Sequence, residues 1–145
     1  MKGLSVRAPW WWYILHAGKD IENRDWSTRY RGPLLIMASK WWKADEVAAT
    51  ALEVARMMGD REGAASPSYA NLRYGMRSLG GHIVGLVDVV DCVASSDSPW
   101  FVGRYGLKLA NPRVAPNPVP FPGALTMVDV PDDVVDRLGF ARVPA

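Results

Sequence analysis

Two stretches of the chain place apolar residues at the spacing of an α-helix. The first begins at Ala8-Pro9, where proline suits the first turn, and Gly18 provides its stop. The second is predicted over Ala44–Met58, and Gly59 closes it. The segment PDDVVDRLGF near the end of the sequence predicts a capped terminal helix.

Short apolar runs bounded by turn residues predict the strands. Gly32–Ser39 indicates a buried strand, and GGHIVGLVDVVDCVAS indicates a long one in which Gly85 marks a bulge or bend. Further strands are expected at Tyr105–Leu109 and Ala124–Val130, separated by NPRVAPNPVPFPG. Because strands and helices do not alternate, the pattern favours an α+β fold built on a small β-barrel over a doubly wound sheet.

Length and composition narrow the class of protein. The chain of 145 residues is 49% hydrophobic, which suits one domain over residues 1–145 with one core. No run of apolar residues is long enough to span a membrane, and the first ten residues lack the apolar run of a secretory signal. The single cysteine, Cys92, excludes an internal disulfide and a thiolate zinc cluster. We therefore expect a cytoplasmic protein without membrane contact.

Positive charge and aromatic rings gather in the first third of the chain. Residues 1–43 hold eight Lys/Arg against three acids, and eight of the fifteen aromatic residues. Cations interleaved with flat rings suit a surface that holds phosphates and stacks bases. The alternative is that the rings belong to the core and the charges to a solvated face.

The first helix has more large side chains than one buried face can hold. At 100° per residue, Trp11 and Leu15 share one face, whereas Trp12, Tyr13 and His16 lie opposite. We expect Trp12 or Tyr13 to be a contact residue. For Tyr13 the alternative is an amphipathic ring at the helix edge.

Metal and cofactor chemistry has no sequence support. His16 and His82 are the only histidines, and neither belongs to a spaced ligand set. The chain has no G-x-x-x-x-G-K-[ST] and no G-x-G-x-x-G motif. We expect neither a metal site nor a cofactor.

Six segments in order resemble one known family. They are SVRAPW, GKDIENRDW, YRGPLLIMASK, GHIVGLVDVVDC, WFVGRYGLKL and FPGAL, and the most specific is Gly-Lys-x-x-Glu-x-Arg, here Gly18, Lys19, Glu22 and Arg24. From Leu4 to Val130 the chain resembles the ASCH domain family of the PUA-like superfamily. The resemblance implies a small β-barrel with flanking helices and a cleft between them.

The same resemblance implies a choice of functions. ASCH relatives are associated with RNA or DNA binding, some act as ribonucleases, and a smaller branch hydrolyses N4-acylcytidine nucleosides. In that branch a threonine stands three residues after the lysine, where this chain has Glu22. The departure disfavours the amidohydrolase and leaves a binder of single-stranded RNA, with a metal-independent ribonuclease as the enzymatic alternative.

Lys19 is the expected centre of the site. A lysine in a desolvated cleft binds an anion or acts as a base, Glu22 accepts or carries protons, and Arg24 pairs with phosphate or with Glu22. The alternative is an ion pair of Glu22 with Lys19 or Arg24 that pins a loop. Ser95 and Ser96 follow the long strand and are expected to face Lys19 across the cleft, unless they form a plain turn.

The expected site residues fall into two groups. The candidates for catalysis are Lys19, Tyr13, Glu22, Ser95 and Ser96. Those expected to contact nucleic acid are Arg7, Trp12, Arg24, Arg31, Ser39, Lys40, Trp41 and Tyr105.

Overall fold

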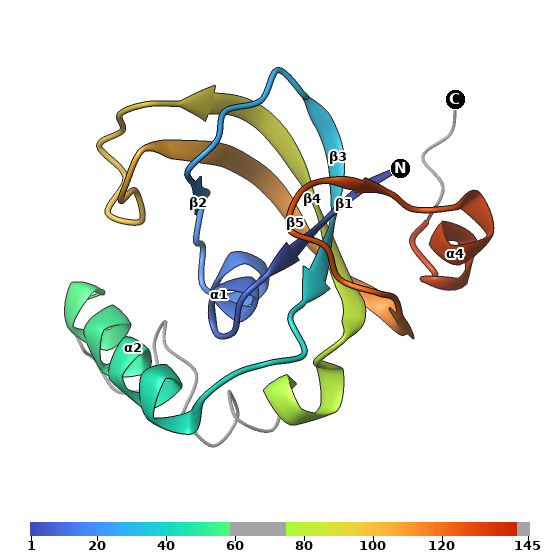
Figure 1. Ribbon diagram of the computed structural model, residues 1–145, viewed down its shortest axis with the longest axis horizontal. Coiled ribbons are helices and arrows are strands. Elements are labelled where there is room, and N and C mark those ends of the chain that lie inside the picture. Colours follow the sequence, from blue (N-terminus) through green and yellow to red (C-terminus); the bar gives the residue numbers. More distant parts are fainter. Residues whose placement is uncertain (59–74, 142–145) are drawn as a thin grey trace.

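The computed structural model describes residues 1–58 and 75–141. Within them, six strands form one strongly curled sheet with the order β2-β5-β4-β3-β1-β6 (Figure 1). β1 and β3 run parallel, and the other neighbouring strands are antiparallel. The strands are β1 (Lys2–Val6), β2 (Ile21–Arg24), β3 (Gly32–Ala38), β4 (His82–Val93), β5 (Tyr105–Pro120) and β6 (Val128–Asp129).

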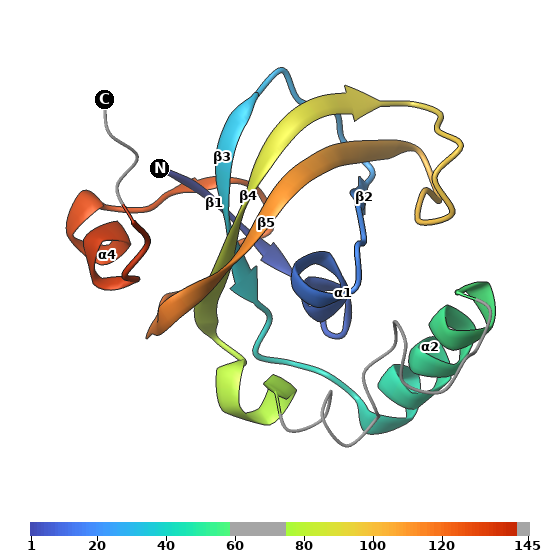
Figure 2. The same cartoon turned by 180° about the vertical axis from the view of Figure 1, so that it is seen from behind.

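The helices lie on different sides of this half-barrel. α1 (Trp10–His16) lies in the hollow of the sheet, whereas α2 (Ala44–Met57) lies beyond α1, away from the strands (Figures 1 and 2). α4 (Asp132–Arg137) packs on the outer side, and residues 75–79 form one further helical turn before β4. The arrangement confirms the α+β prediction, with an open half-barrel whose edges are β2 and β6.

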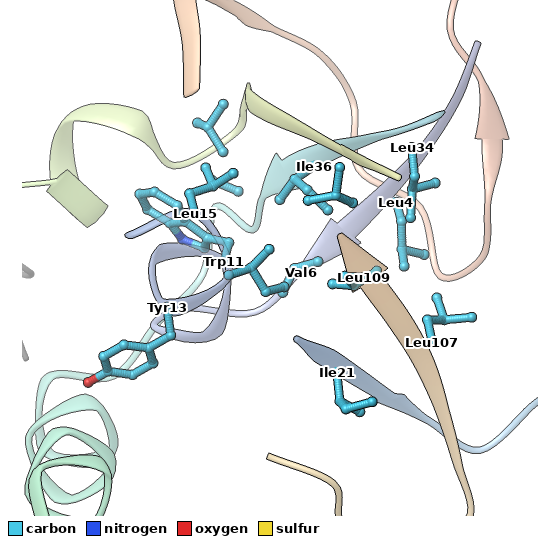
Figure 3. Close-up of a cluster of buried hydrophobic side chains, with 14 of the residues drawn as sticks. Leu4, Val6, Trp11, Tyr13, Leu15, Ile21, Leu34, Ile36, Leu107 and Leu109 are labelled. Carbon is cyan, nitrogen blue, oxygen red and sulfur yellow. The ribbon is translucent and has the colours of Figure 1, made fainter. Parts of the chain in front are cut away.

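Two hydrophobic clusters hold the sheet from its two faces. Leu34 and Ile36 of β3 point into the inner cluster with α1, and Leu35 and Met37 point into the outer cluster with α4. Because successive strand residues face opposite sides, a strand covered on both faces reads as one continuous apolar run. This explains why β3 could be predicted from its sequence. Figure 3 shows the inner cluster gathered around Trp11 and Leu15 of α1.

Gly85 lets α1 approach the sheet closely. The pairing of β4 with β3 shifts beside Gly85, between Ile36 and Met37, and its pairing with β5 also shifts there. A Cβ at Gly85 would lie 2.4 Å from Leu15 Cδ2 and 2.9 Å from the Arg113 carbonyl oxygen. The predicted irregularity at Gly85 is confirmed, and its reason is the space that Leu15 occupies.

β5 departs most from the sequence prediction, because it continues through the proline-rich segment to Pro120. Its partner β2 pairs only with Tyr105–Lys108, so the prolines follow in a part of β5 that has β4 on one side alone. Proline is tolerated in an edge strand because its missing N–H removes no ladder bond there. β1 was not predicted, and β6 is shorter than the expected strand. The segment from Gly59 to Ser68, whose Gly, Ala, Ser and charged residues predict a loop, lies outside the described residues.

Candidate functional site

A cleft of about 1230 Å³ lies beside α1 and α2. Its floor comes from β1, β2 and the loop before β2, and its walls come from α2 and from the loops that follow β3, β4 and β5. The volume exceeds the roughly 300–1,000 Å³ of ordinary small-molecule pockets. Apolar rings and prolines line most of the walls, whereas the floor carries charge: Lys19, Glu22 and Arg24.

The end of α1 places Lys19 at this floor. Gly18 has a φ of +73°, a left-handed conformation that favours glycine, and no neighbour crowds it. The Lys19 N–H then donates to the Tyr13 carbonyl oxygen at 3.1 Å, and the Leu109 N–H donates to the Asp20 carbonyl oxygen at 2.8 Å. The turn is therefore held between α1 and β5, and Lys19 is 3% exposed.

Lys19, Glu22 and Arg24 form one chain of ionic contacts. Lys19 Nζ donates to the Ile21 carbonyl oxygen and lies 3.4 Å from Glu22 Oε1. Glu22 Oε2 accepts from Arg24 Nη2 at 3.1 Å, and the same nitrogen donates to the Ser5 carbonyl oxygen of β1 at 2.5 Å. Two cations share one carboxylate, so the floor keeps a net positive charge.

Aromatic rings cover both cations of the floor. Lys19 Nζ lies 5.5 Å from the centroid of the Trp10 ring, and the Arg24 guanidinium lies 5.9 Å from that of Trp26. Burial lowers the pKa of the Lys19 ammonium below its ordinary value, against the opposing pull of the Glu22 carboxylate. The floor therefore combines a desolvated ammonium with a guanidinium that is partly open to the cleft.

The rim carries cations and one prominent ring. Arg7, Lys40 and Trp41 are exposed and line the cleft, and Ser39 lines it half-buried. The Trp41 side chain is 85% exposed, which leaves both faces of its indole open to solvent. Two exposed acids, Asp25 and Glu53, also line the cleft.

The sequence model of the ASCH domain matches residues 4–101, which is more than half of the chain. The chain belongs to the ASCH domain family. The matched region contains the last three residues of β1, all of β2, β3 and β4 and the whole Lys19–Arg24 motif, and it ends before β5 begins. A search of the curated proteins found no match.

The ASCH cleft brings together seven of the residues predicted from sequence. Glu22 and Arg24, two positions apart on β2, contact each other as an extended segment predicts. The predicted residues that line the cleft are Arg7, Lys19, Glu22, Arg24, Ser39, Lys40 and Trp41.

Ser95 and Ser96 do not line the cleft as expected. Both are exposed in the loop after β4, and Ser96 Oγ accepts from the Ser98 N–H at 3.1 Å, which is the turn alternative. Ser98 instead contacts the lysine loop, because its hydroxyl donates to Asp20 Oδ1 at 2.6 Å. The serine that reaches the lysine loop is therefore two residues further along the chain than the predicted Ser96.

The prediction that Trp12 or Tyr13 is a contact residue is corrected for Tyr13 by the packing of α1. Tyr13 is fully buried and packs against Trp10 and Trp100, with ring centroids 6.0 and 5.9 Å away. Its hydroxyl has no hydrogen-bond partner among the described residues, and burial raises the pKa of Tyr13 to about 12. Trp12 is half-buried, and a Cβ added at Gly75 would meet its ring at 2.5 Å. Both rings therefore pack against other parts of the chain.

Arg31 and Tyr105 also lie outside the cleft lining. Arg31 is exposed before β3 and pairs with Asp91 at 3.3 Å. Tyr105 begins β5 opposite Arg24, and the Arg104 guanidinium lies 5.3 Å from its ring centroid. The proposed contacts of these two residues with a ligand gain no support from the cleft.

Sequence reasoning missed several parts of the ASCH cleft. Trp10 and Trp100 contribute wall rings, and Ser5 holds Arg24 through its carbonyl oxygen. Asn23 fixes one wall, since its amide donates to the Trp100 carbonyl oxygen at 2.9 Å and accepts from the Val102 N–H at 3.0 Å. Trp10 and Ser5 belong to the segment SVRAPW, whose resemblance to the ASCH family could have indicated that they lie at the site.

Two features are absent from residues 1–58 and 75–141. These residues contain no group of three or more His, Cys, Asp or Glu placed to hold a metal ion. They also contain no helix that is long and apolar enough to cross a membrane.

Proposed function

We propose that this ASCH domain binds single-stranded RNA in the cleft. The observation that carries the proposal is the combination, in one cleft, of the exposed rim cations Arg7 and Lys40 with the exposed Trp41 ring, above a floor that is also cationic. Unpaired bases bind by stacking on aromatic rings, while cations hold the phosphates between them. A duplex would keep its bases stacked inside and could not use Trp41 in this way.

The rim suits the backbone of such a ligand better than the floor does. Arg7 and Lys40 are exposed, so they can bind phosphates at the surface, where the phosphates keep contact with water. Trp10 and Trp100 also line the cleft, and the Trp10 ring lies against Lys19, so a flat, largely apolar group fits the floor better than a phosphate does. We therefore place the backbone on the rim and one unpaired base inside.

A metal-independent ribonuclease is the second candidate, favoured by the lowered pKa of Lys19 beside Glu22. A neutral lysine would accept the proton of a ribose 2′-hydroxyl as the 2′-oxygen attacks the phosphorus, and the resulting ammonium would return that proton to the leaving 5′-oxygen. Tyr13 is a poor donor for this role because its pKa is raised and its hydroxyl is buried. An amidohydrolase gains no support, since both carboxylate oxygens of Glu22 are engaged with cations.

The test measures retention and cleavage in one series. Fluorescently labelled RNA of about ten nucleotides, the size of an extended single-strand site, is titrated with the protein in the presence and absence of EDTA. Fluorescence anisotropy reports binding, and a denaturing gel reports cleavage; the same sequence as DNA and as an RNA duplex serves as control.

We expect single-stranded RNA to bind more tightly than the duplex, whether or not EDTA is present. Cleavage that persists in EDTA and is lost in Lys19→Met would establish the ribonuclease instead of the binder. Equal affinity for the duplex and the single strand would contradict the proposal.

A further inference from the structure

The hydrogen-bonding groups that remain free at the cleft floor are mainly donors. Arg24 carries five N–H groups, of which the two on Nη2 are bonded to Ser5 and Glu22. Its Nε–H and both N–H groups of Nη1 have no acceptor within the described chain. One of the three N–H groups of Lys19 is likewise unbonded there. The floor therefore has unused donors.

The acceptor groups beside them are less open to a ligand. Each carboxylate oxygen of Glu22 accepts from one cation, and the Glu22 side chain is 9% exposed against 19% for Arg24. The side-chain amide of Asn23 uses both its oxygen and its nitrogen on the wall loop. The free carboxylates of the cleft, Asp25 and Glu53, are exposed, where water satisfies them. The most accessible polar group of the floor is thus the Arg24 guanidinium.

We infer that the cleft prefers bases that present a keto oxygen, such as uracil, to bases that present an amino group, such as cytosine. The inference rests on the proposed binding of RNA and names the class of base that the floor accepts. Uracil carries an acceptor oxygen at the position where cytosine carries an amino donor, and adenine likewise carries an amino donor where hypoxanthine carries an oxygen. An amino group facing Arg24 and Lys19 would set donor against donor, away from water.

The experiment compares matched oligonucleotides in fluorescence anisotropy. An oligomer of uridine and one of cytidine have the same length, sugar, phosphates and ring size, and they present different hydrogen-bonding edges on the same backbone. Oligomers of inosine and adenosine supply the same contrast for purines. We expect the keto member of each pair to bind about 10-fold more tightly, the effect of one buried donor left without an acceptor.

Arg24→Gln tests whether Arg24 causes the preference for keto bases, and Arg29→Gln is the matched control. Arg29 is an exposed arginine five positions further on, and it does not line the cleft. The ratio of uridine to cytidine affinity should fall toward one in Arg24→Gln and stay unchanged in Arg29→Gln. Arg24→Lys, which keeps the charge, should also reduce the ratio because it removes the guanidinium donors.

The outcomes separate this inference from the proposed function. Equal affinities for the uridine and cytidine oligomers would overturn the base preference and leave RNA binding intact. An equal loss of affinity for both oligomers in Arg24→Gln, with the wild-type ratio kept, would make Arg24 a phosphate contact and overturn its assignment. Failure of every oligomer to bind would overturn the proposed function and the inference with it.

Discussion

Two neighbouring tryptophans allow a paired test of the site. Trp41 is 85% exposed and lines the cleft, whereas Trp42 is half-buried, packs against the inner hydrophobic cluster and is absent from the cleft lining. The two rings are adjacent in the chain and of the same type. Truncation of each to alanine should therefore separate binding from stability.

The two substitutions should differ in which quantity they change, the RNA affinity or the free energy of unfolding. Trp41→Ala should weaken RNA binding by about 1–3 kcal/mol, the value of one stacked base, and change the free energy of unfolding by less than about 0.5 kcal/mol. Trp42→Ala should cost about 1–2 kcal/mol of stability, below the roughly 3–5 kcal/mol for a fully buried ring. Its effect on RNA affinity should be small.

Urea denaturation followed by circular dichroism measures the stability of each variant, and anisotropy with single-stranded RNA measures its affinity. The reasoning would be refuted if Trp41→Ala lost stability and kept its affinity, because Trp41 would then be a packing residue. Loss of affinity in a folded Trp42→Ala protein equal to that in Trp41→Ala would place the RNA elsewhere.

Three further substitutions test the packing around the cleft. Lys19→Met leaves Glu22 with one cationic partner, so we expect a loss of roughly 1–3 kcal/mol of stability in urea and weaker RNA binding; unchanged affinity would remove Lys19 from the site. Because the pKa of Tyr13 is raised to about 12 in the folded protein, the stability that its neutral form contributes is complete below pH 10 and is lost as the pH rises toward 12. Tyr13→Phe should abolish that loss and, at neutral pH, add about 1 kcal/mol by deleting a buried hydroxyl that has no partner in residues 1–58 and 75–141; a destabilised variant with an unaltered alkaline profile would show that the hydroxyl has a partner. Gly85→Ala should cost about 1–3 kcal/mol through its clash with Leu15, and a melting temperature equal to the wild type's would contradict the close approach of α1.

The polar floor of the site could be predicted because its residues are close in sequence. Gly18 ends α1, and two positions separate Glu22 from Arg24 along an extended segment, so local geometry alone brings them to one side. β3 and the bulge at Gly85 were predictable for a similar reason, since each leaves a local signature of apolar or small residues.

Contacts between distant segments explain what was missed. The period of α1 indicates one buried face, but Trp100 covers Tyr13 and Gly75 approaches Trp12, and neither contact is written in the helix itself. The continuation of β5 through its prolines depends on the short length of β2, which leaves that part of β5 without a second neighbour. Such features follow from tertiary pairing and not from local propensity.

The salt dependence of RNA binding tests the central claim most directly. If phosphates lie on the exposed rim cations Arg7 and Lys40, the logarithm of the association constant should fall linearly with the logarithm of salt concentration between about 50 and 200 mM. The double variant Arg7→Gln/Lys40→Gln should bind more weakly and reduce the slope by about 1.4, the contribution of two phosphate contacts on a single strand. A binding constant indifferent to salt, or a slope that the double variant leaves unchanged, would contradict the placement of RNA in this cleft.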